Sequence, residues 1–454
     1  MGERYDVVVV GARCAGSSLA AKLANRGLSV ALVDKATFPS DTLSTHVFQN
    51  DAGRILADLG VLDRLLASGA PWIEQVDLRI EELAMVHRWP RRPGDPGPWL
   101  SVRRPVLDTA LVEAAGEAGA TVRTGTRVVG LVERDGRVAG VRAAGGGVGG
   151  GDGGPETELL APLVVGADGR GSVVARLTGA RSYNLARNQR LACWAYYEGA
   201  AVPEPGTFLA HRWDDEFLGA WPCDAGLELV LTIAPADRAA QFRQDPAGAL
   251  DAHVARCPPL AAMVAPARRV GRPLLATRWT SYFRESAGPG WVLVGDAGHF
   301  KDPTPGQGIT DALRQAERLA VAVVEGLGGT RPLDGAMTSW WRWRDRDARE
   351  MAWFAGDFGR AGPVPPVFVE ILLRLAEDGA STDRFLDVLA HRVRPSQILT
   401  PARLLGATAR LVRAGTRPRR QVVAETREIM VEDLRRRWLN HRPRYGTVVG
   451  ADVE

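Results

Sequence analysis

A run of four valines that leads into a glycine turn constrains this chain most strongly. Residues 7–18 read VVVVGARCAGSS. An unbroken β-branched run is typical of a parallel strand that is buried on both faces. The helical composition of residues 17–25 ends at Arg26-Gly27, and a second apolar run covers 29–33. This order predicts a strand–helix–strand unit within residues 5–34.

The turn after the valines is a degenerate Gly-x-Gly-x-x-Gly pattern. Gly11 and Gly16 supply the first and third glycines, whereas Arg13 stands at the second position. The first glycine allows a tight turn and the third allows close packing of helix on strand. A guanidinium is a good bidentate partner for phosphate, and the N-terminus of a helix attracts anions.

Asp34 closes the second strand, where a carboxylate can accept hydrogen bonds from ribose hydroxyls. The pattern therefore predicts dinucleotide binding, while a plain strand–helix–strand unit whose glycines serve only packing stays open as the alternative. The predicted binding residues of this unit are Gly11, Ala12, Arg13, Cys14, Ala15, Gly16, Asp34 and Lys35.

The order of the later segments predicts an α/β protein with a discontinuous domain. Buried parallel-type runs recur at 159–167 and 290–297, whereas 181–285 has the short alternating segments of an antiparallel sheet. We expect a doubly wound, Rossmann-like nucleotide domain, an inserted antiparallel β-sheet domain that binds the substrate, and a C-terminal helical region. The expected bounds are 1–75, 100–180 and 286–335 for the first, 76–99 and 181–285 for the second, and 336–454 for the third. The glycine-rich stretch 145–154 is expected to be a flexible hairpin tip.

The composition excludes several other classes. The net charge is +4, and the arginines are spread along the chain, which argues against nucleic-acid binding. The four cysteines show neither C-x-x-C spacing nor nearby histidines, so no metal site is expected. Neither a secretory signal nor an uninterrupted apolar run of about 18 residues is evident. We expect a cytoplasmic protein without an integral membrane segment.

Two further stretches place an aspartate at the end of an apolar strand: VVGADGRGSVVAR (164–176) and VLVGDAGHFKDPTPGQGITDA (292–312). Together with the first turn and SVRRPVLDTAL (101–111), they make the chain resemble the para-hydroxybenzoate hydroxylase-like FAD flavoproteins over residues 5–320. That family includes aromatic hydroxylases, squalene-type epoxidases, flavin-dependent halogenases and geranylgeranyl reductases. The resemblance implies FAD as the cofactor.

The resemblance also implies roles for individual residues. Asp296 would bind the ribityl chain of FAD, Arg104 would reach its phosphate and ribityl region, and backbone near Val128 would hold the adenine. Backbone N–H groups of the following turn would lie beside the pyrimidine edge of the flavin ring. The residues of this turn are Pro303, Gly306, Gln307, Gly308 and Ile309.

The chain departs from the family pattern in the stretch that follows Asp168. Ser172 matches the family, but position 175 is alanine and the arginine stands at Arg176. Because that motif is linked to NAD(P)H contact, direct reduction by NAD(P)H and reduction by a separate flavin reductase both stay open. Asp168 itself can serve the site or simply cap the next turn.

The resemblance implies an FAD-dependent monooxygenase with NAD(P)H as reductant. Oxygen would pass from a flavin C4a-hydroperoxide to an aromatic or olefinic small molecule, by hydroxylation or epoxidation. The alternatives are a geranylgeranyl-reductase-like flavoprotein that saturates a C=C bond, a flavin-dependent halogenase, and a non-catalytic flavin-binding module. The W-x-W-x-I-P motif of halogenases does not occur, and the tryptophans of SWWRWRDRD (339–347) are expected in the core.

Two residues are candidates for catalysis. His46 can act as an acid or base near the flavin, or it can anchor a loop. Lys301 can complement the charge of reduced flavin or of substrate, or it can be an ordinary solvated lysine. The expected pocket residues, alternate ones of which would face the core, are Trp194, Tyr196, Phe208, His211, Trp213, Phe217 and Trp221.

Overall fold

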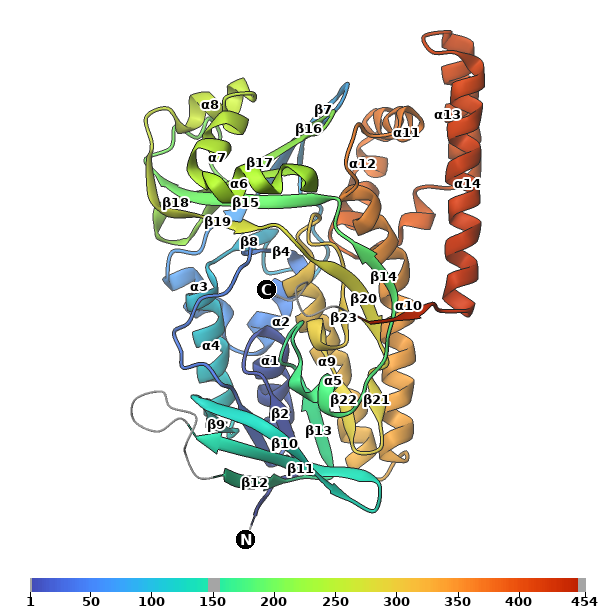
Figure 1. Cartoon of the computed structure of the whole chain (residues 1–454). Coiled ribbons are helices and arrows are strands. Elements are labelled where there is room, and N and C mark those ends of the chain that lie inside the picture. The colour runs from blue at the N-terminus through green and yellow to red at the C-terminus, as the bar shows by residue number, and fades with distance from the viewer. Residues whose placement is uncertain (1, 146–155, 448–454) are drawn as a thin grey trace.

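The valine run forms the centre of a six-stranded sheet. The computed structural model describes residues 2–145 and 156–447, so the expected glycine-rich hairpin tip lies outside the described residues except for Gly145. The strand order is β21-β22-β13-β2-β3-β9 (Figure 1). The strands are β2 (Val7–Val10), β3 (Val30–Val33), β9 (Thr121–Arg123), β13 (Leu163–Gly166), β22 (Trp291–Leu293) and β21 (Ala287–Gly288). All pairs are parallel except that of the edge strand β21 with β22.

Both faces of this sheet are covered, which explains why its strands carry apolar side chains on both sides. On one face, Val7 and Val9 pack in a cluster with α1 (Cys14–Ala24), α9 (Gly308–Leu327) and α10 (Leu333–Phe358). On the other face, Val8 and Val10 pack against a four-stranded sheet of order β1-β12-β11-β10. Its strands are β1 (Glu3–Arg4), β10 (Thr126–Arg134), β11 (Arg137–Gly145) and β12 (Glu156–Leu160).

A seven-stranded sheet of order β19-β15-β18-β17-β16-β6-β7 lies above the first sheet in Figure 1. Its pairs are antiparallel except for β16 with β6. The short helices α6 (Ala239–Gln244), α7 (Pro246–Val254) and α8 (Pro258–Val264) contribute to the core on one face. The strands are β6 (Gln75–Ile80), β7 (Leu83–Arg88), β15 (Arg190–Glu198), β16 (Thr207–Trp213), β17 (Glu216–Cys223), β18 (Leu227–Pro235) and β19 (Arg268–Ala276).

Two small sheets and several helices join these parts. One sheet has the order β4-β8-β5 and the other β23-β20-β14-β24. Their strands are β4 (Val47–Phe48), β5 (Trp72–Ile73), β8 (Trp99–Ser101), β14 (Ser182–Arg187), β20 (Thr280–Arg284), β23 (His299–Phe300) and β24 (Tyr445–Gly446). The connecting helices are α2 (Asn50–Asp58), α3 (Leu62–Ala67), α4 (Arg104–Glu117) and α5 (Val173–Leu177).

The C-terminal region is helical, as its pattern predicts. It contains α10, α11 (Pro366–Ala376), α12 (Gly379–Leu389), α13 (Pro401–Ala414) and α14 (Arg419–His441), the last running along the outside of the molecule in Figure 1. The Thr400 side chain accepts a hydrogen bond from the Arg403 N–H and so caps α13. Trp340 is buried in the core, as expected. No helix in the described part of the chain is long and apolar enough to cross a membrane.

Candidate functional site

A cleft of about 940 Å³ opens where β2, β3 and β13 end. Ligands of open α/β sheets bind at the carboxyl ends of the strands, and this volume lies near the upper limit of about 1,000 Å³ for ligand pockets. Ala12, Gly16 and Gln307 lie outside its lining. The residues expected from the sequence that do line it are Gly11, Arg13, Cys14, Ala15, Asp34, Lys35, His46, Arg104, Val128, Trp194, Asp296, Lys301, Pro303, Gly306, Gly308 and Ile309.

The glycines of the first turn are needed because backbone crosses backbone there. Gly11 has φ +103°, and a Cβ built on it would lie 2.4 Å from the Ala167 carbonyl oxygen. A Cβ on Gly16 would lie 1.8 Å from the carbonyl oxygen of Gly11. Asp34 accepts hydrogen bonds from the N–H groups of Ala12 (2.6 Å) and Ala36 (2.8 Å). Backbone therefore packs directly on backbone in this turn, and neither glycine position has room for a side chain.

Arg13 is engaged within the protein, which the sequence did not indicate. Its guanidinium donates to Asp108 (2.6 Å), to the Ser40 hydroxyl (3.1 Å) and to the Asp41 carbonyl oxygen (3.2 Å). Asp108 is fully buried and also accepts from Arg104 (2.9 Å). Both arginines line the cleft, and both neutralise one buried carboxylate. The only sequence signal for Asp108 is its position four residues after Arg104, on the same face of a helix.

The two strand-end aspartates differ in their surroundings. Asp296 lines the cleft, and burial raises its pKa to about 6 although Arg170 and Arg104 oppose the shift. Asp168 accepts hydrogen bonds from the Ser172 hydroxyl (2.5 Å) and the Val173 N–H (2.6 Å) at the start of α5. Burial raises the pKa of Asp168 as well. The capping interpretation of Asp168 is thus confirmed, and Asp168, like Asp296, also lines the cleft.

Lys301 is buried, so its interpretation as a solvated surface lysine is wrong. Its Nζ lies 2.6 Å from Asp311 Oδ2 and donates to Gln307 Oε1 at 2.6 Å. The side-chain amide of Gln307 in turn donates to the carbonyl oxygens of Val388 (3.2 Å) and Leu389 (2.8 Å). The sequence could not predict these partners because the last two come from the C-terminal helices.

His46 lies at the other wall of the cleft in a left-handed backbone conformation, φ +64°. Its Nε2 pairs with the hydroxyl of Tyr196, and its buried Nδ1 has no partner among the described residues. Burial, assisted by Arg104, lowers the pKa of His46 to about 3. The imidazole is therefore neutral near pH 7.

An apolar pocket joins the cleft and shares Thr45, Val47, Ala192, Trp279, Pro303 and Gly306 with it. Phe208, Phe217 and Trp221 line the pocket, as expected. The rings of Phe208 and Trp221 stack with their centroids 4.7 Å apart. Trp89 and Trp99, which the sequence analysis did not select, stack at 3.6 Å on the same pocket. None of its lining residues in the described chain is charged.

His211 and Trp213 do not belong to the pocket, which corrects the sequence-based expectation. Side chains alternate along a strand, so in β16 Phe208 and Ala210 face the pocket whereas His211 and Trp213 face the opposite side. His211 contacts Cys257 Sγ (3.5 Å) there, and Trp213 packs on the core beneath α7 and α8. Trp194 lines the cleft, and Tyr196 faces His46.

Residues 4–338 match the family described as FAD binding domain. The chain belongs to this family. It is an FAD-dependent oxidoreductase of the para-hydroxybenzoate hydroxylase-like superfamily, as the motifs implied.

Its relatives carry out different reactions. The chain is 24% identical to the 1H-pyrrole-2-carbonyl-(peptidyl-carrier protein) brominase of Pseudoalteromonas luteoviolacea, over 72% of this chain and 78% of the relative. It is 29% identical to the digeranylgeranylglycerophospholipid reductase of Methanosarcina acetivorans (72% and 77%), and 27% identical to the rifampicin monooxygenase of Rhodococcus hoagii (72% and 65%). The solved structure of the flavin-dependent brominase Bmp2 superposes with a TM-score of 0.74 at 22% identity, over 90% of this chain and 100% of that chain.

The residues present fit an FAD cofactor. Gly11 and the first residues of α1 line the cleft, and the free N–H groups at the start of a helix suit a pyrophosphate. The cleft runs from Val128 on β10 to the edge of the apolar pocket at Pro303 and Gly306.

Proposed function

We propose that the protein is an FAD-dependent monooxygenase that uses NAD(P)H and transfers oxygen to an apolar aromatic or olefinic small molecule. The observation that carries this proposal is the uncharged, aromatic pocket that joins the cofactor cleft directly. The pocket itself has a free volume of only about 80 Å³, so a substrate would occupy it together with the adjoining part of the cleft. Its uncharged lining favours an apolar group there, and its aromatic walls suit a planar one. Its walls would also exclude water from the reacting atoms.

The resemblance suggests roles for the cleft residues, and their places along the cleft support these roles. The turn at Gly11 would hold the pyrophosphate, Asp34 the ribose and Asp296 the ribityl hydroxyls. Since Asp34 already accepts from two N–H groups, a ribose would use the remaining lone pairs of its carboxylate. Backbone N–H groups at the start of α9, from Gly308, would face the ring. When bound, FAD supplies the activation of oxygen.

His46 would shape the cleft wall beside Thr45 and Val47, which line both cavities, while Tyr196, which lines neither, would hold His46. With a pKa of about 3, His46 is too weak a base to take a proton efficiently near pH 7. His46 would therefore serve as a neutral, buried part of the cleft wall rather than as a base. The Tyr196 hydroxyl holds the imidazole in place from the other side.

Among the relatives, the rifampicin monooxygenase supports oxygen transfer. The digeranylgeranylglycerophospholipid reductase and the brominase favour the two other reactions of this fold. An apolar pocket alone does not distinguish oxygen transfer, reduction and halogenation, because a polyene or an aromatic ring can be the substrate of each reaction. The test must therefore follow the source of the new atom.

The experiment is turnover of the FAD-loaded protein with NADH or NADPH and a panel of phenols, naphthols and prenyl alkenes. The proposal predicts that substrate accelerates NAD(P)H oxidation and that the product carries oxygen from isotopically labelled O₂. Anaerobic saturation of an alkene would instead show a reductase, and halide in the product a halogenase. Turnover that requires an added flavin reductase would show that a separate reductase, and not NAD(P)H directly, reduces the flavin.

A further inference from the structure

Lys301 is a buried cation on the wall of the cofactor cleft. Its side chain is 5% exposed, and its ammonium contacts Asp311 and Gln307. An ammonium has three N–H donors, so these two acceptors leave one N–H for another partner. Burying a lysine is costly unless it is paired, and burial indeed lowers its pKa while Asp311 opposes the shift.

Lys301 lies at the end of the cleft that joins the apolar pocket. Pro303 and Gly306, a few residues further along the same turn, line both cavities. A cofactor that reacts with a substrate in the pocket must present its reactive part at this end. The partner nearest to the free N–H of Lys301 would then be the flavin ring rather than the adenosine.

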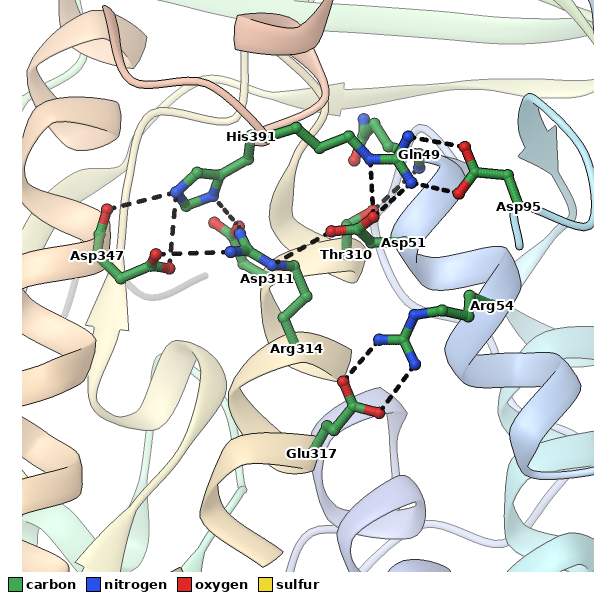
Figure 2. A network of polar contacts seen from close by, with 11 residues as sticks. Gln49, Asp51, Arg54, Asp95, Thr310, Asp311, Arg314, Glu317, Asp347 and His391 are labelled. Atoms are coloured by element: carbon green, nitrogen blue, oxygen red, sulfur yellow. Dashed lines mark hydrogen bonds and ion pairs between the residues drawn. The ribbon is translucent and has the colours of Figure 1, made fainter. Parts of the chain in front are cut away.

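The two acceptors of Lys301 are held from outside the FAD-binding domain. Figure 2 shows Asp311 between His391 and Arg314, and His391 Nδ1 lies 2.7 Å from Asp311 Oδ1. Gln307 is held by backbone carbonyls at the end of α12. Because His391 and α12 lie beyond residue 338, where the match to the family ends, the C-terminal helices fix this cation.

We propose that Lys301 donates its third N–H to the flavin ring and stabilises the negative charge that the ring gains on reduction. Asp311 and Gln307 are its positioning residues, and His391 holds Asp311. The inference rests on the proposed placement of FAD, but not on oxygen transfer. A fixed cation beside a flavin favours the reduced form and raises the reduction potential.

The test is an anaerobic redox titration of the FAD-loaded protein without substrate. Lys301→Met should lower the preference for reduced over oxidised flavin about tenfold, which for two electrons is a potential about 30 mV lower. Lys301→Arg should restore most of this loss, while the affinity for oxidised FAD changes little. Lys22→Met is the matched control, because Lys22 is also buried and paired, with Glu317 at 3.2 Å, but does not line the cleft.

A double variant separates the proposal from a purely structural role. If Lys301 only neutralises Asp311, then Lys301→Met with Asp311→Asn removes both charges and returns the potential to the wild-type value. That result, or an unchanged potential in Lys301→Met alone, overturns the proposal. A potential that stays low in the double variant supports it.

If the Met variant does not load FAD, Lys301→Gln, which keeps a neutral N–H donor, should give an intermediate shift. Wild-type protein that binds no FAD would refute the cofactor assignment itself, and a failure of oxygen transfer would leave this measurement unaffected.

Discussion

Replacing Gly11 by alanine tests whether the first turn holds the cofactor. The residue has φ +103°, and strain of an L-residue in such a conformation costs about 1–3 kcal/mol. The new Cβ would also lie 2.4 Å from the Ala167 carbonyl oxygen, closer than real Cβ contacts. Overpacking of this kind costs about 1–3 kcal/mol more. Together the strain and the overpacking lower the free energy of unfolding by about 2–6 kcal/mol. This is a large part of the roughly 5–15 kcal/mol by which a typical domain is stable.

The control is Gly27→Ala, which has similar strain but free space. Gly27 has φ +81°, and nothing lies within 4 Å of a Cβ built there. The Gly27→Ala variant should lose only about 1–2 kcal/mol of its free energy of unfolding and should bind FAD as the wild type does. In Gly11→Ala the turn must move away from Ala167, which displaces the N–H groups that face the cleft.

Two measurements check the prediction. Urea unfolding of the apoprotein gives the stability of each variant, and quenching of FAD fluorescence gives its affinity. We expect Gly11→Ala to lose FAD binding under conditions in which it is still folded. The reasoning is refuted if Gly11→Ala matches Gly27→Ala in both unfolding and FAD affinity.

Three further predictions follow from the contacts. Arg13→Gly should retain FAD and lose about 1–3 kcal/mol of stability in thermal unfolding, because Asp108 loses one of its two arginine partners. Loss of FAD in this variant would show instead that the guanidinium contacts phosphate. Trp221→Ala should raise the KM of an apolar substrate while Trp213→Ala leaves it unchanged, since only the first lines the pocket; equal effects would contradict the assignment of faces. Burial raises the pKa of Glu228 from 4.5 to about 8, so the folded state holds this proton and loses stability as the pH rises through that window. Glu228→Gln should abolish this loss, and at pH 9 its free energy of unfolding should exceed that of the wild type by up to about 5 kcal/mol. Equal urea midpoints at pH 5 and pH 9 in the wild type would argue against it.

Local sequence determined the central unit of this protein and its family. The valine run of β2 predicts a strand that is buried on both faces, because β-branched residues fill such positions. The dipeptide Asp135-Gly136 is typical of a hairpin turn, and both residues have positive φ between β10 and β11. The composition of residues 50–67 favours one continuous helix, but Gly60, with φ +69°, separates α2 from α3.

The aromatic pocket was predicted only in part. Alternation along a strand indicates that Phe208 and Trp213 point to opposite faces, but not which face meets the cofactor. Trp89 and Trp99 come from separate segments, so no local pattern could show that their rings stack. The side of the sheet that becomes the pocket is decided by where the C-terminal helices and the cleft pack.

The charges of the site depended on the tertiary structure alone. Arg13 carries the right chemistry for phosphate, yet it pairs with a carboxylate 95 positions away. Lysine is usually a surface residue, but His391 and α12 enclose the two partners of Lys301. Sequence periodicity is a local property, which determines strands, helices and turns. Whether a charged side chain meets solvent, a ligand or a distant partner is determined by the packing that removes it from water.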